Sequence, residues 1–214
     1  MEGYIVDADY EITDGKTEIH LFGRLENDQS FFASHPSEPY FFIKTADTGK
    51  VKKILQKFKV ENTSFTNFKS EKVAKISHPL NSEVNKLYQA LHNTIDTYEA
   101  DIKPIQRYLI DNNILGSIEI QGEYASAEKI DRIYKNAEIK PSFIKPKLKI
   151  LSIDTESNKK SDKLFCIGLY SENYKKNFFV SNKKLDNAVS CKSESECLIK
   201  FKEELIKFDP DIIT

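Results

Sequence analysis

The sequence predicts an α+β domain with a mixed antiparallel sheet and helices, followed by an incomplete α/β domain. Three observations support this fold class. Short β-rich runs separated by turn signals fill the first 44 residues, amphipathic helical patterns follow, and three apolar runs after residue 147 precede a longer helical pattern. The expected boundaries are residues 1–115 for the first domain, 116–147 for a connecting segment and 148–214 for the second domain.

The first domain begins with four β-rich runs, which are residues 4–6, 18–22, 30–32 and 40–43. Turn signals at Asp14-Gly15, at residues 27–28 and at residues 36–39 separate them, so the runs predict a small antiparallel sheet. Apolar residues then recur at helical spacing over residues 51–58 and 84–95. These two predicted helices bracket a further strand at residues 72–76.

The segment from 116 to 147 contains one strand-like run at residues 117–121, a charged stretch around residues 125–136, and prolines at 141 and 146. This mixture predicts a connection between two domains.

The second domain begins with apolar runs at residues 148–153, 164–170 and 177–180, which predict a three-stranded meander. Residues 193–196 have the S-x-x-E form of a capping box, and Leu198, Phe201, Leu205 and Phe208 follow at helical spacing. We therefore expect a helix that ends at Asp209-Pro210, because proline cannot continue the hydrogen-bond ladder. Residues 212–214 then start another strand-like run.

Composition limits the classes of protein that need to be considered. The 214 residues include 39% hydrophobic and 30% charged side chains, and the formal net charge of -1 lacks the basic excess of a small DNA-binding module. No apolar run approaches the roughly 20 residues that span a bilayer, and the N-terminus has no signal-peptide pattern. Three cysteines without a C-x-x-C spacing favour a reducing cytoplasm, and the four histidines have no metal-ligand spacing.

The residues most suggestive of chemistry are Asp154 and Glu156, at the end of the apolar run Lys149-Ile-Leu-Ser-Ile. Residues i and i+2 of a strand point to the same face, so we expect the two carboxylates to project side by side. Divalent cations relieve the repulsion between such carboxylates, and two-metal sites of this kind hydrolyse phosphodiesters. The alternative is that both acids are exposed polar residues where a strand meets a loop.

The order of elements, with a carboxylate pair on the first strand of a meander followed by a helix and another strand, is typical of ribonuclease H-like nucleases. The run LKILSIDTE (residues 148–156) resembles the first exonuclease motif of family B DNA polymerases, with Thr155 in place of the usual isoleucine. DPDIIT (residues 209–214) is similar to the segment leading into the second exonuclease motif. The runs IVDADY (residues 5–10), EPYF (residues 38–41) and YEADIKPIQRYL (residues 98–109) resemble the N-terminal domain of the same family.

This resemblance implies the N-terminal part of a template-directed DNA polymerase with a 3′-5′ proofreading exonuclease that acts in DNA replication or repair. The implied cofactor is Mg²⁺ or Mn²⁺ at Asp154 and Glu156, and the implied partners are DNA and the rest of the polymerase chain. The family places further metal ligands after the segment that residues 209–214 resemble, so we expect half an exonuclease site and little activity from this chain alone. Bacterial DNA polymerase II is the favoured branch, and archaeal enzymes are the second choice.

In archaeal relatives the N-terminal domain captures template uracil, and four positions of that pocket match here, at Tyr10, Pro39, Tyr40 and Arg107. Ser82 and Lys103 depart from the family pattern, so the resemblance implies contact with single-stranded template rather than uracil sensing. For these residues, core packing and an ion pair at Arg107 are the structural alternative. Two further functions remain open: a stand-alone or split-subunit module that binds single-stranded nucleic acid, and an unrelated α+β domain.

Overall fold

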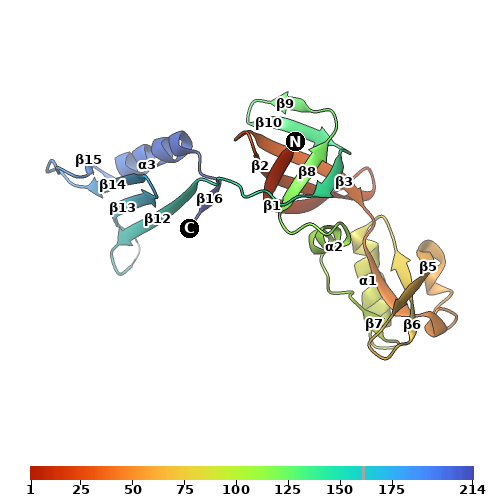
Figure 1. Cartoon of the computed structure of the whole chain (residues 1–214). Coiled ribbons are helices and arrows are strands. Elements are labelled where there is room, and N and C mark those ends of the chain that lie inside the picture. Colours follow the sequence, from red (N-terminus) through yellow and green to blue (C-terminus); the bar gives the residue numbers. More distant parts are fainter. Residues whose placement is uncertain (161) are drawn as a thin grey trace. The chain divides into compact units, whose positions relative to one another are not determined.

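The computed structural model describes residues 1–160 and 162–214, and the chain folds into two compact units, residues 1–145 and 146–214 (Figure 1). Each unit has its own hydrophobic core. None of the helices in the described part of the chain is long and apolar enough to cross a bilayer.

The first unit contains a seven-stranded sheet with the order β11-β8-β1-β2-β3-β10-β9. Its strands are β1 (Glu2–Thr13), β2 (Lys16–Leu25), β3 (Ser30–Ser37), β8 (Ser117–Gln121), β9 (Ala125–Ala127), β10 (Ile130–Lys135) and β11 (Glu138–Pro141). The turn predicted at Asp14-Gly15 is confirmed: both residues have positive φ, 50° and 74°, as a two-residue hairpin requires. Glycine is also needed at Gly23, where a Cβ would lie 1.9 Å from the carbonyl oxygen of Tyr4.

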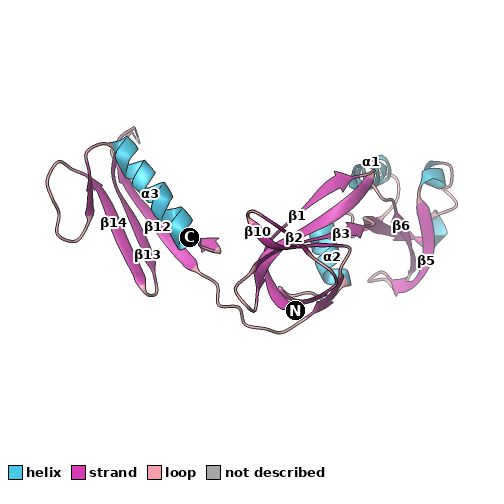
Figure 2. Cartoon of the chain, turned by 90° about the horizontal axis from the view of Figure 1, so that it is seen from above, coloured by secondary structure: helices cyan, strands magenta, loops and turns pink. Residues whose placement is uncertain are grey.

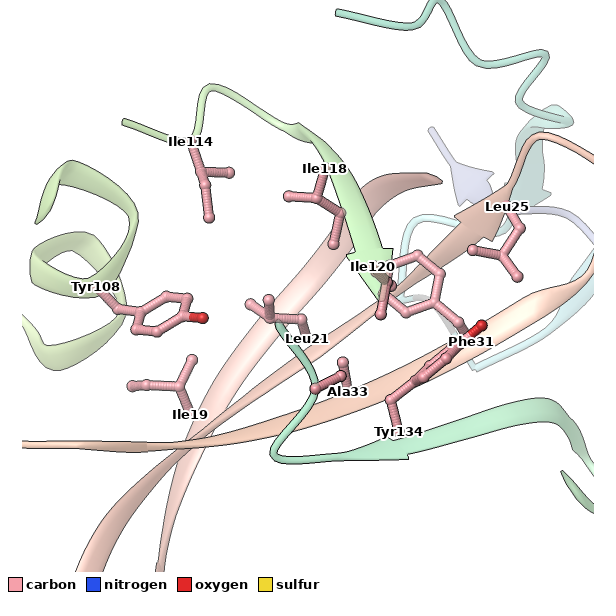
Figure 3. Close-up of a cluster of buried hydrophobic side chains, with 11 residues drawn as sticks. Ile19, Leu21, Leu25, Phe31, Ala33, Tyr108, Ile114, Ile118, Ile120 and Tyr134 are labelled. Carbon is pink, nitrogen blue, oxygen red and sulfur yellow. The ribbon is translucent and has the colours of Figure 1, made fainter. Parts of the chain in front are cut away.

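Helix α2 (Pro104–Asp111) closes the core of this sheet. Its Tyr108 points toward Ile19 and Leu21 of β2, while Ile118 and Ile120 of β8 complete the cluster (Figure 3). Sequence periodicity did not identify α2, because it is only eight residues long and has a buried arginine at position 107.

The prediction that residues 116–147 only connect two domains is wrong. Four of the seven sheet strands lie there: β8 pairs antiparallel with β1, and β10 pairs parallel with β3. The charged stretch contains β10, in which Tyr134 is buried while its strand neighbours Ile133 and Lys135 are more exposed. Residues as far as Lys145 therefore belong to the first unit.

A second sheet of the first unit has the order β5-β6-β4-β7. Its strands are β4 (Tyr40–Lys44), β5 (Lys59–Thr66), β6 (Lys72–Ser77) and β7 (Thr97–Tyr98). Helix α1 (Asn81–Leu91) buries Val84, Leu87 and Leu91 against one face of it. The strand expected at residues 72–76 and the helix expected around residues 84–95 are thus confirmed, the helix in shorter form.

Two expectations for this region are wrong. The run at residues 40–43 belongs to the second sheet, not to the sheet of β1, β2 and β3. The helix expected over residues 51–58 is a single 3-10 turn, η2 (Ile54–Lys57), after a shorter one, η1 (Thr45–Asp47). Val51 and Leu55 are buried in the same core cluster as the buried residues of α1, and the side chain of Lys53 makes no capping hydrogen bond to the turn.

The second unit has a five-stranded sheet with the order β15-β14-β13-β12-β16 and one helix on one of its faces (Figure 2). Its elements are β12 (Ile150–Ser157), β13 (Leu164–Ser171), β14 (Tyr174–Val180), β15 (Val189–Cys191), α3 (Glu194–Phe208) and β16 (Ile212–Ile213). The predicted meander is confirmed, because β12, β13 and β14 pair antiparallel in sequence. The strand expected from residue 212 pairs parallel with β12.

Helix α3 begins as the sequence predicts. The Ser193 Oγ accepts a hydrogen bond of 3.2 Å from the Glu196 backbone N–H, and the Glu196 carboxylate accepts one of 2.7 Å from the N–H of Lys192. The helix ends at Asp209, which has a left-handed conformation before Pro210. Its buried face contains Cys197, while Leu198 is 51% exposed, so the expected apolar stripe is displaced by one residue at its start.

Candidate metal site

Asp154 and Glu156 lie on the exposed face of β12. Leu151 and Ile153, which alternate with them, belong to the core that α3 covers. The two carboxylates therefore point away from the helix-covered face, as alternation along a strand requires. Both residues are exposed to solvent.

The strands beside β12 provide no cation directly opposite this pair. Cross-strand pairing places Gly168 next to Asp154 and Cys166 next to Glu156. Because directly opposed side chains are the closest neighbours on a sheet face, the negative charge of the pair is not balanced there. Two adjacent hard oxygen donors without a countercharge suit a divalent cation such as Mg²⁺ or Mn²⁺.

Backbone and side-chain hydrogen bonds fix the first half of the strand that holds the pair. On its outer side, Ile153 N–H donates to the carbonyl oxygen of Thr214 (2.9 Å), and the hydroxyls of Ser152 and Thr214 are 2.7 Å apart. The Asp211 carboxylate accepts a 2.8 Å hydrogen bond from the Lys149 N–H. Sequence reasoning missed this role of Asp211, although an acid before a short apolar run was visible.

The two carboxylates are the whole donor set that the described residues bring together. Across residues 1–160 and 162–214, no group of three or more His, Cys, Asp or Glu side chains converges as a metal centre would require. The pair fits a hard divalent cation by the chemistry of its donors, and it supplies two of the ligands that such an ion takes.

The other predicted site residues lie in the first unit, where Arg107 packs on Tyr40. The Arg107 guanidinium carbon is 4.3 Å from the centre of the Tyr40 ring, and Lys75 Nζ is 4.0 Å from the same centre. Tyr10 accepts a 3.2 Å hydrogen bond from Asn81, and the Pro39 carbonyl accepts one of 3.2 Å from the N–H of His78.

Tyr40 and Arg107 are bound into the protein itself. Burial raises the pKa of Tyr40 to about 12, assisted by the 2.8 Å hydrogen bond that its hydroxyl donates to Asp111. Arg107 is 5% exposed and donates a 2.8 Å hydrogen bond to the Glu99 carboxylate. The ion pair considered as the structural alternative for Arg107 is therefore present.

These two residues also line a cleft of about 810 Å³ that the sequence did not reveal. Its aromatic lining comprises Tyr40, Phe42, Phe65, Phe68 and Tyr98. Phe68 is fully exposed and Phe65 is 63% exposed. Phe65 and Phe68 lie in a charged segment next to a turn, and this was the sequence signal that could have identified the aromatic cleft.

Comparison with known proteins agrees with the fold. The profile of the family described as DNA polymerase family B, exonuclease domain, matches residues 95–214, more than half of the chain. A DNA polymerase of Archaeoglobus fulgidus is 27% identical over 100% of the chain and 28% of its own length. DNA polymerase II of Escherichia coli K12 is 25% identical over 78% of the chain and 21% of its own length.

A solved structure has the same fold. The family B DNA polymerase from the hyperthermophilic archaeon Pyrobaculum calidifontis matches with a TM-score of 0.73 and 19% identity, over 100% of this chain and 30% of that one. The fold and the family profile together define the class of this chain, which is the exonuclease region of a DNA polymerase. The chain belongs to the family of family B DNA polymerase exonuclease domains.

The family resemblance seen in the sequence is confirmed, and relatives occur in both of the suggested branches. Their identities, 27% and 25%, do not rank one branch above the other. The chain spans less than a third of the length of each of these relatives.

Proposed function

We propose that this chain contributes to a template-directed DNA polymerase and that its second unit takes part in 3′-5′ removal of nucleotides from DNA. The observation that carries the proposal is the position of Asp154 and Glu156 on one exposed face of β12, where the residues directly opposite them on β13, Gly168 and Cys166, carry no positive charge. Membership of the family B exonuclease domains supports it. Replication or repair in the cytoplasm is the setting that we propose, in keeping with three free cysteines.

The proposed roles of the protein groups follow from their chemistry. Asp154 and Glu156 would hold Mg²⁺ or Mn²⁺ through carboxylate oxygens, and the hydrogen bonds of Ser152 and Ile153 to Thr214 keep the strand that presents them in place. A divalent cation bound there would neutralise charge on a phosphodiester and assist the attack of water on phosphorus. With two protein ligands, binding by this chain should be weak and hydrolysis of DNA negligible.

Titration with Mn²⁺, followed by electron paramagnetic resonance of the free ion, tests this proposal on the chain as it stands. The double variant Asp154→Asn/Glu156→Gln should lose the bound fraction. Asp9→Asn/Glu11→Gln is a matched control, since Asp9 and Glu11 have the same i, i+2 spacing on exposed β1. In contrast to Asp154, Asp9 has an ion-pair partner, His20, at 3.1 Å. Equal Mn²⁺ binding by the wild type and the Asp154/Glu156 variant would contradict the proposal.

Contact with single-stranded DNA in the first unit is a second proposal, based on Tyr10, Pro39, Tyr40 and Arg107. The aromatic cleft beside Tyr40 and Arg107 favours it, because exposed rings stack on bases without regard to sequence. Anisotropy of a labelled oligonucleotide should show affinity that falls with salt, as phosphate contacts require.

Exposed aromatic residues allow a matched comparison for this second proposal. Phe65→Ala and Phe68→Ala, at two exposed rings of the cleft, should each weaken binding, by about 1–3 kcal/mol where a base stacks on the ring. Phe143→Ala is the control, because Phe143 is 88% exposed in the same unit and does not line the cleft. Equal affinities for all three variants would exclude stacking at this surface.

A further inference from the structure

The second sheet of the first unit has an open edge at β5. This strand is the last in the order β5-β6-β4-β7, and among residues 1–160 and 162–214 it pairs with β6 alone. Its regular pairing runs from Lys59 to Asn62, opposite Ser77 to Ala74. The backbone N–H and C=O groups on the other side of this stretch have no strand partner in the described chain. Such an edge can accept one more strand from another protein.

An apolar hollow of about 450 Å³ lies beside this edge, and its apolar lining consists of Leu55, Phe58 and Val60. Val60 pairs with Ile76, a fully buried residue of the core that α1 covers, so the two side chains point to the same face of the sheet. Leu55 and Phe58 belong to that core as well, whereas Val60 is 41% exposed. The hollow is therefore the open end of a hydrophobic core, at the strand where the sheet stops.

Positive charge surrounds the hollow. Lys52 lines it, and Lys53 and Lys57 lie at the two ends of the 3-10 turn η2. All three lysines are exposed, and none of them forms an ion pair with a residue that the structure describes. Lys50 and Lys59, their neighbours in the sequence, are already bound by carboxylates. The three unpaired lysines thus leave a positive surface around an apolar centre.

We propose that β5 accepts an extended acidic peptide of a partner protein, which adds to the sheet as a new edge strand and places an apolar side chain in the hollow. A residue of the added strand opposite Val60 would point to the same face and would enter the hollow. Carboxylates of the peptide would complement Lys52, Lys53 and Lys57. A DNA strand could meet the lysines, but it has no peptide backbone with which to continue the ladder of β5.

The test uses the 214-residue chain and a short fluorescein-labelled peptide in which aspartate alternates with valine. Fluorescence anisotropy should show binding, and the affinity should fall as salt screens the charges. A peptide with serine in place of valine has no apolar side chain for the hollow, and one with lysine in place of aspartate has the wrong charge. Both should bind more weakly by about tenfold or more.

N-methylated peptides distinguish strand addition from attraction between charges. The amides of alternate residues point to opposite edges of a strand, and one edge alone can pair with β5. Methylation of all the valine amides and methylation of all the aspartate amides should therefore have unequal effects. One of the two peptides should lose binding, and the other should retain it.

Variants of the chain test the surface itself. Lys52→Glu/Lys57→Glu should weaken peptide binding by about tenfold or more, because the carboxylates of the peptide would then be repelled. Lys129→Glu/Lys135→Glu is the matched control, since it changes the charge equally at two exposed positions of the same unit. Val60→Asp should also weaken binding, because it adds a negative charge to the hollow. If Val60→Asp does not fold, as its thermal midpoint would show, the lysine variants and the N-methylated peptides decide.

Unchanged peptide affinity in Lys52→Glu/Lys57→Glu, or equal effects of the two N-methylated peptides, would overturn the inference. A wild-type chain that binds oligothymidylate through these lysines but does not bind the acidic peptide would overturn it in favour of a DNA surface. A wild-type dimer that Val60→Asp dissociates, without peptide binding, would assign the edge to a second copy of the chain. The carboxylate pair lies in the other unit, so none of these results changes the proposed exonuclease role.

Discussion

Arg107 and Tyr40 hold each other in place: the guanidinium carbon lies 4.3 Å from the ring centre, and Nη1 donates a 3.3 Å hydrogen bond to the tyrosine hydroxyl. The same guanidinium binds the Glu99 carboxylate and backbone carbonyl, and the Tyr40 hydroxyl donates to Asp111. One buried side chain of α2 is thus tied both to β4 and to the loop between β7 and α2.

Replacing Arg107 with alanine should lower the free energy of unfolding by about 1–3 kcal/mol, because Tyr40 loses a donor and the buried side-chain volume is emptied. Urea unfolding followed by circular dichroism measures this. Arg132→Ala is the comparison, since Arg132 lies 4.4 Å from the ring of Tyr124, which is 51% exposed. A loss in Arg132→Ala as large as that in Arg107→Ala would contradict the central role of Arg107.

Glu204 of α3 provides a test of pH dependence. The ion pair with Lys176, and then the 2.7 Å hydrogen bond from the Tyr174 hydroxyl, hold the pKa of Glu204 below its usual range. A lowered folded-state pKa stabilises the fold above the unfolded-state pKa of about 4.3, and this stabilisation is lost as pH falls through the folded-state value.

Glu204→Gln should therefore destabilise the chain at pH 7 by about 1–2 kcal/mol, and its difference from the wild type should shrink below about pH 4. Thermal unfolding over a pH series measures the difference. Glu203→Gln, at an exposed neighbouring position of the same helix, should have little effect at any pH. A constant difference between Glu204→Gln and the wild type from pH 7 to pH 3 would show that the carboxylate charge is not responsible.

Ser193 caps the first turn of α3 through the 3.2 Å hydrogen bond from the Glu196 N–H. Ser193→Ala should reduce the free energy of unfolding by about 1 kcal/mol, because the helix N-terminus loses an acceptor. Ser195→Ala should be neutral or slightly stabilising. Ser195 is a helical residue with its side chain exposed to solvent, and alanine has the higher helix propensity. Chemical denaturation measures the free energy of unfolding of both variants. Equal changes in Ser193→Ala and Ser195→Ala would contradict the capping role of Ser193.

Gly23→Ala should destabilise the first unit by about 3 kcal/mol, because the new Cβ would overlap the Tyr4 carbonyl oxygen and force β1 and β2 apart. The thermal midpoint is the measurement. Gly15→Ala is a useful comparison: nothing lies within 4 Å of its Cβ, so only its φ of 74° opposes the substitution. A thermal midpoint of Gly23→Ala above that of Gly15→Ala would mean that β1 and β2 move apart at little energetic cost.

The structural features that were predicted correctly depend on residues that are close together in the sequence. Ser193 and Glu196 mark the start of α3 within four residues, and the apolar runs of β12, β13 and β14 pair with their immediate neighbours. The carboxylate pair was recognised for the same reason, since Asp154 and Glu156 are two residues apart on one predicted strand. Short-range spacing is sufficient for such features.

The parts that sequence missed depend on pairing between distant residues. Arg132 of β10 pairs with Phe31 of β3, about a hundred positions earlier, and an alternating pattern does not state which strand is the partner. The row formed by Asp154, Gly168 and Asn177 likewise becomes visible only when the register of the three strands is known. The contact of Arg107 with Tyr40 required the packing of α2 against β4.

The parallel pairing of β16 with β12 also has a consequence for the order of folding. Ile150 and Ile212 are brought together across most of the second unit's sequence, whereas the hairpins of the meander close short loops. Short loops close first because their entropic cost is lower, so the meander should form before β16 docks. Until then the carboxylate strand is an unprotected sheet edge, and its two like charges discourage association with another chain during that interval.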